Sequence, residues 1–225
     1  MKRPELCRQS LGFDTTVNCE YNLYIVNDLS SILRLPEGPE RTAAVTAWVQ
    51  GLYPPEFEPP VLVGGAAVEL FTGGAYTTGD LDFAGTVPEP VARKLKTAGF
   101  ERRGRHWVHR PGEVFLEFPA SELAAKEESR TMQVSGRTLE ILSPEAVLAD
   151  RLASWEFWNS EQDGINAFLV WRSAYETIDA NKLGLLVEDR HLEAAWDRFT
   201  EFSERYLEKE PTPEELARWA SRPSR

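Results

Sequence analysis

The chain has few of the residues that form disulfides or bind soft metals, with two cysteines and three histidines among 225 residues. Cys7 and Cys19 lie near the N-terminus without metal-site spacing, so we expect free thiols in a reducing cytoplasm. Long apolar runs are also lacking: no segment approaches the roughly 20 residues that cross a bilayer. Because the N-terminus has no signal-peptide core either, the sequence predicts a cytoplasmic protein without a membrane partner.

Positive charge is scarce too, because 25 lysines and arginines face 36 acidic residues and leave a net charge of -11. An acidic surface repels polynucleotides, so a nucleic-acid partner would need a local basic patch. One basic stretch could guide a tRNA end or a triphosphate, although solvated helix and hairpin charges are the favoured explanation. This stretch comprises Arg93, Lys94, Lys96, Arg102, Arg103, Arg105, His106, His109 and Arg110.

A hydrophobic content of 42% is enough for a buried core. Residues 1–40 end in the breaker-rich Leu35–Pro39 and are interpreted as an N-terminal extension. Residues 41–142 mix strand and helix patterns, and residues 143–225 are mainly helical. The sequence therefore predicts an α+β protein, in which a small mixed sheet is flanked by helices and followed by a C-terminal helical region.

Periodicity and breakers predict the individual elements. Strands are expected at 61–63, 105–108, 114–118 and 138–141, with a strand-like segment around 80–83. Helices are expected at 41–52, 89–98, 144–157, 163–175, 181–188 and 190–207, before a charged tail from Pro213. Apolar-periodic helices carry five tryptophans, which we expect to contact the core unless one stacks on a base: Trp155, Trp158, Trp171, Trp196 and Trp219.

The most informative segment begins with the apolar strand 61–63, which leads into Gly64 and Gly65. Glycines at this point let a phosphate approach the backbone N–H groups at the start of the following helix. Asp80 and Asp82 then stand two residues apart. Since side chains alternate along a strand, both carboxylates project to one side and offer Mg²⁺ the hard oxygen ligands it prefers.

Gly64-Gly65 followed by Thr78-Gly79-Asp80-Leu81-Asp82 resembles the nucleotidyltransferase superfamily, whose fold is that of the DNA polymerase β palm. Within it the chain looks most like the small AbiEii and MenT toxin-type proteins, and the similarity covers about residues 61–85 well. It implies transfer of a nucleoside monophosphate from a triphosphate to a hydroxyl, with two Mg²⁺ ions, or Mn²⁺ in their place. It also implies a nucleotide-binding role for Gly64, Gly65 and Thr78, and an antitoxin partner.

The family mechanism needs a third carboxylate on a neighbouring strand to complete the metal cage. Glu117 is our candidate because it stands between Leu116 and Phe118, where an acid is unexpected unless its face opens onto a site. Glu113 shares that face by period two and is the alternative. A plain solvent-facing position on an edge strand would also account for Glu117.

The resemblance also directs attention to the helix that begins after Ser143. Arg151 stands where relatives usually have a lysine, and it could neutralise triphosphate charge. Asp163 and Asn166 fall at the positions of two aspartates, although Asp163 as a helix N-cap and Asn166 as a surface or packing residue would serve equally well. Tyr76 replaces an arginine that many relatives have before the Thr-x-Asp-x-Asp pattern.

The leading hypothesis from the sequence is a metal-dependent nucleotidyltransferase in which Asp80, Asp82 and Glu117 are catalytic and hold the metal. The acceptor would be a tRNA 3′ end, a protein hydroxyl or a small molecule. A catalytically silent nucleotide-binding or partner-binding protein of the same fold is the alternative. A phosphohydrolase using the acidic pair is a third hypothesis, although the histidine and aspartate clustering of that chemistry is lacking.

Overall fold

The computed structural model describes residues 28–221, so the predictions that concern Cys7, Cys19 and the rest of residues 1–27 lie outside it. Its centre is a seven-stranded mixed sheet with the order β3-β4-β5-β2-β1-β7-β6. The strands are β1 Val61–Val63, β2 Leu81–Ala84, β3 Glu101–Arg103, β4 His106–His109, β5 Val114–Ala120, β6 Ser129–Val134 and β7 Arg137–Leu142.

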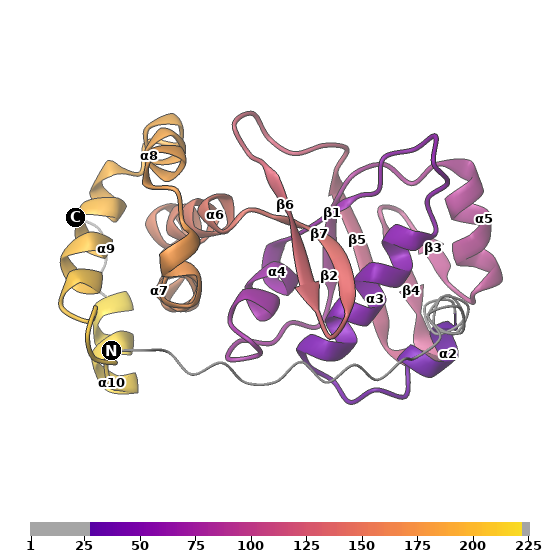
Figure 1. The fold of residues 1–225 in the computed structure, drawn as a ribbon, viewed down its shortest axis with the longest axis horizontal. Helices are drawn as coiled ribbons and strands as arrows, with labels where there is room; N and C mark the ends of the chain where they lie inside the picture. Colours follow the sequence, from indigo (N-terminus) through magenta and orange to yellow (C-terminus); the bar gives the residue numbers. More distant parts are fainter. Residues whose placement is uncertain (1–27, 222–225) are drawn as a thin grey trace, which may run out of the picture.

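Helices accompany the sheet and continue after it. The N-terminal part holds α2 Leu29–Ile32, α3 Pro39–Gly51, α4 Gly64–Phe71 and α5 Glu89–Thr97. The C-terminal part holds α6 Pro144–Trp158, α7 Glu161–Ala174, α8 Ala180–Asp189, α9 Glu193–Glu204 and α10 Pro213–Ala220. Figure 1 shows α6 to α10 gathered at one end of the molecule and the sheet with α2, α3 and α5 toward the other. The predicted α+β class is thus confirmed.

The strand pairing brings the segments with Gly64-Gly65 and Asp80-Asp82 beside strand β5. β2 lies between β1, to which it is antiparallel, and β5, to which it is parallel. β1 is also parallel to β7, so the sheet is mixed as predicted. Within residues 28–221, none of the helices combines the length and apolar character that a bilayer crossing requires.

One hydrophobic cluster runs through the sheet and the helices on either side. It includes Leu62 and Phe83 in the central strands, Leu148 in α6 and Phe199 in α9, all of them buried. Leu29 and Ile32 of α2 also belong to it, so part of the segment before residue 41 packs on the core. The division into an extension, a core and a helical region stays a prediction.

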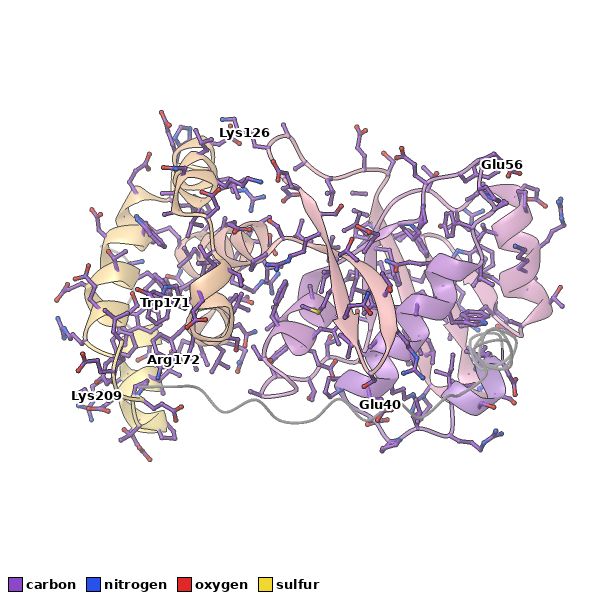
Figure 2. All side chains as sticks on the ribbon, viewed as in Figure 1. Glu40, Glu56, Lys126, Trp171, Arg172 and Lys209 are labelled. Atoms are coloured by element: carbon purple, nitrogen blue, oxygen red, sulfur yellow. The ribbon has the colours of Figure 1, made fainter. Side chains whose placement is uncertain are left out.

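Several aromatic rings pack against one another between the C-terminal helices. Trp155 packs on Trp219 with ring centroids 4.6 Å apart, and its indole N–H donates to the carbonyl of Ala220 at 2.7 Å. Trp171 lies among these helices, and the neighbouring Arg172 donates to the carbonyls of Tyr206 and Leu207 (Figure 2). Such ring pairs stabilise a core beyond the area they bury.

Several expectations need correction. The segment from Pro213 is a helix, α10, rather than a charged tail, because Thr212 and Glu215 form a capping box and Trp219 joins the aromatic core. Trp158 is 80% exposed and does not contact the core as expected, because α6 ends there and Asn159 adopts a left-handed conformation. The three-residue strand β3 and the six-residue strand β6 were not predicted.

Candidate metal centre

Asp80, Asp82 and Glu117 come together at the centre of the sheet. One carboxylate oxygen from each lies within 4.8 Å of the others. The cause is the strand register: Asp82 on β2 pairs directly with Glu117 on the parallel β5, and Asp80 immediately precedes β2. The prediction that these three carboxylates converge is therefore confirmed.

The local sequence explains how the two aspartates face outward. Leu81 is 8% exposed and Phe83 is fully buried, so the opposite side of β2 is fixed to the core. Strand alternation then directs Asp82 to the open side. Asp80 is exposed and accepts a hydrogen bond from the Thr78 hydroxyl at 3.1 Å, which holds the carboxylate in place.

The carboxylates of Asp80, Asp82 and Glu117, together called the acid group, repel one another. Burial raises the pKa of Asp82 to about 6, and repulsion from Asp80 and Glu117 adds to the effect. A divalent ion would relieve this repulsion, and three carboxylates are the hard oxygen donors that Mg²⁺ and Mn²⁺ accept. The residues present therefore fit either of these ions.

The double glycine is required by the close approach of β2. Gly64 has φ +64°, and a Cβ atom there would lie 2.3 Å from the Asp82 Oδ2 atom. A Cβ atom on Gly65 would lie 2.9 Å from the Thr78 hydroxyl oxygen and 3.3 Å from that of Tyr76. Both glycines begin α4, whose first N–H groups thus lie beside the acid group.

Two side chains contact Glu117, one from the turn between β3 and β4 and one from the first residue of β4. Arg105 Nε lies 2.6 Å from Glu117 Oε1, and His106 Nδ1 lies 3.4 Å from Oε2. Both belong to the basic stretch, which sequence reasoning left without a specific contact. The antiparallel register that sets His106 opposite Glu117 could not be read from the sequence.

Arg151 lies near the acid group but is already paired. Its guanidinium contacts Asp163 Oδ1 at 2.7 Å and also the carboxylate of Asp150. Its positive charge lowers the pKa of Asp82. Asp163 is not a helix N-cap: α7 is capped by Ser160, whose hydroxyl accepts a hydrogen bond from the Asp163 N–H.

The remaining candidates have other surroundings. Asn166 is buried, and its carbonyl oxygen accepts a hydrogen bond from the Gln162 side chain at 3.0 Å. Glu113 precedes β5, has φ +49° and lines a different cavity, so period two does not place it with Glu117. The sequence did not reveal Glu69, a buried acid that accepts a hydrogen bond from the Thr42 hydroxyl at 3.1 Å and lines one cavity together with Thr78.

Open space lies on both sides of the acid group. On the β1 side, a cavity of about 710 Å³ is lined by Gly64, Asp82, Asp150 and residues 119–125. On the β4 side, a pocket of about 350 Å³ is lined by Asp80, Glu117 and the exposed Phe115, among others. The carboxylates are therefore reachable from two directions.

Comparison with known proteins adds little to this geometry. No protein-family model matches the chain, and no curated protein sequence matches it. Among solved structures, an antigenic nucleotidyltransferase-like protein from Paracoccidioides brasiliensis superposes with a TM-score of 0.49 and 19% identity. The superposition covers 72% of this chain and 95% of the other. Because the TM-score is below 0.5, we take neither activity nor ligand from this similarity.

Proposed function

We propose that the protein is a metal-dependent nucleotidyltransferase that moves a nucleoside monophosphate from a nucleoside triphosphate to a hydroxyl group. The observation that carries the proposal is the convergence of Asp80, Asp82 and Glu117 beside the glycine-led start of α4. Carboxylates that bind divalent ions and backbone N–H groups that bind phosphate then adjoin each other.

The chemistry follows from these positions. Asp80, Asp82 and Glu117 would hold the metal, which when bound acidifies the attacking hydroxyl and neutralises charge on the phosphates. The acceptor oxygen attacks the α-phosphorus, the bond from the α-phosphorus to the oxygen bridging to the β-phosphorus breaks, and diphosphate leaves with that oxygen. Glu117 would accept the proton of the acceptor hydroxyl.

Binding of the triphosphate would use residues on the β1 side of the acid group. The N–H groups at Gly64 and Gly65 and the hydroxyl of Thr78 are the proposed phosphate donors. Arg151 contributes positive charge near Asp82 while its own partners, Asp150 and Asp163, keep it oriented. These assignments extend the sequence-based proposal and are supported by proximity.

The acceptor and the biological setting are proposed from the resemblance to toxin-type proteins. The acceptor would be a tRNA 3′ end, a protein hydroxyl or a small molecule. A toxin role implies an antitoxin partner and action in the cytoplasm. An acidic chain could reach a tRNA end through the local basic stretch between Arg93 and Arg110.

The proposal is tested by incubating the protein with each radiolabelled triphosphate, Mg²⁺ and cell extract. We expect label to appear in a macromolecule or small molecule, and expect Asp80→Ala together with Asp82→Ala to abolish the transfer. Glu56→Gln is the matched control, because Glu56 is an exposed acid that belongs neither to the acid group nor to the lining of the two cavities beside it. Equal label transfer by the double variant would refute the assignment.

A catalytically silent nucleotide-binding or partner-binding protein is the second candidate. The observation that favours it is the engagement of both Glu117 oxygens by Arg105 and His106, which compete with a metal for the third ligand. Calorimetry separates the two functions. Tight triphosphate binding without any transfer in the labelling assay supports the silent protein, and measurable transfer excludes it.

A further inference from the structure

The segment that carries α4, Asp80 and Asp82 supplies no positive charge of its own. Residues 42–92, which contain α4, Asp80 and Asp82, include neither lysine nor arginine. A nucleoside triphosphate carries several negative charges, which the metal neutralises only in part. Cations from other elements must therefore meet the phosphates.

Arg151 is poorly suited to do this alone. Two carboxylates already contact it, from Asp150 and Asp163, and its side chain is only 15% exposed. The two carboxylates offset the charge of the guanidinium and occupy two of its N–H donors, which weakens its attraction for a phosphate. A second cation is therefore needed beside the phosphates.

Arg105 is the arginine of the basic stretch that reaches the acid group. Arg103 pairs with Glu101 at 3.2 Å, Arg102 lies over the ring of Trp107, and Arg93 pairs with Glu89. Arg105 instead contacts Glu117, and its positive charge also lowers the pKa of Asp82. Its guanidinium thus lies beside the carboxylates that define the proposed centre.

The Arg105 side chain has room to move away from Glu117. Arg105 is 61% exposed, whereas Glu117 is 15% exposed, so the arginine moves more easily than the glutamate. It follows Gly104, which has φ +64°, in the short turn between β3 and β4. Its backbone stays fixed, because its carbonyl accepts a hydrogen bond from the Phe118 N–H at 3.3 Å.

We propose that Arg105 is a phosphate-binding residue that pairs with Glu117 in the metal-free protein and transfers to the phosphates of the triphosphate when the metal binds. A divalent cation on Glu117 repels the guanidinium and competes for the same oxygens, while the incoming phosphates attract it. Arginine suits this role because its planar N–H donors match phosphate oxygens. The inference rests on the proposed function.

Two binding measurements test it without turnover. Calorimetry with each ribonucleoside triphosphate in Ca²⁺ reports phosphate binding, and titration with Mn²⁺ alone reports the metal site. We expect Arg105→Gln to weaken triphosphate binding about tenfold or more, as for loss of a charged hydrogen bond. The same variant should bind Mn²⁺ alone several-fold more tightly, because the competing cation is gone. Arg105→Lys should lie between Arg105→Gln and the wild type in triphosphate binding.

Arg103→Gln is the matched control, since Arg103 lies in the same hairpin but pairs with Glu101. We expect it to bind both ligands as the wild type does. Wild-type triphosphate affinity in Arg105→Gln would overturn the inference and leave the proposed function standing. Loss of Mn²⁺ binding together with triphosphate binding would assign Arg105 a structural role and also overturn it. If the wild type binds no triphosphate with any metal, the proposed function and the inference both fail.

Discussion

Replacing Asp82 by asparagine should stabilise the protein while removing its response to metal. The pKa of Asp82 is about 6 in the folded protein against 3.8 in the unfolded chain, a difference of about two pH units. Between these two values the folded state binds more protons, so stability falls as pH rises from about 4 to about 6 and stays low above that. At 1.36 kcal/mol per unit, the full cost would be about 3 kcal/mol.

Asp82 is only partly buried, so solvent screening reduces this cost. We expect Asp82→Asn to gain about 1 to 2 kcal/mol at pH 7 and little at pH 4, measured by urea unfolding without divalent ions. Glu122→Gln changes the net charge equally and is the control, with no expected gain. In wild type, Mn²⁺ should raise the melting temperature at pH 7, and in Asp82→Asn it should not. A variant less stable than wild type at pH 7 would refute the electrostatic reasoning.

Three further substitutions test separate parts of the structure. Gly64→Ala should weaken Mn²⁺ binding at least tenfold and cost about 1–2 kcal/mol in urea unfolding, because φ is +64° and the new Cβ would lie 2.3 Å from a carboxylate oxygen. Asp163→Asn should cost about 2 kcal/mol by urea unfolding, since it removes one of two carboxylates from the largely buried Arg151. Trp158→Ser should change the unfolding free energy by less than about 0.5 kcal/mol, whereas Trp155→Ser should cost about 3–5 kcal/mol, because only Trp155 is buried.

The acid group could be predicted because its signals are local. Asp80 and Asp82 flank a buried leucine, and Glu117 interrupts an apolar strand, so strand alternation alone places each carboxylate on an open face. Their convergence needed one further assumption, that the two strands are neighbours. The parallel pairing of β2 with β5 satisfies it.

Other features had no such signal. Strand β3 has three exposed residues, Glu101, Arg102 and Arg103, and therefore no apolar face to reveal it. The contact of Arg105 with Glu117 depends on the β3–β4 turn and the register of β4 on β5. Trp158 lies in an apolar-periodic segment, and only the end of α6 at that residue explains why it remains exposed.

The buried Glu69 shows how the position of a proposed metal ligand depends on residues far from it in the sequence. Burial raises the pKa of Glu69, which is costly to ionise in this position, yet the side chain accepts a hydrogen bond from the Thr42 hydroxyl in α3, and the Thr78 backbone lowers the pKa of Glu69 in turn. Thr78 donates to Asp80 and lines the same cavity as Glu69. An apolar residue at position 69 would remove the carboxylate that interacts with the Thr42 hydroxyl and the Thr78 backbone, and would loosen the loop that carries Asp80. The chain from α3 through Glu69 to Asp80 therefore fixes one of the three carboxylates before any ion arrives.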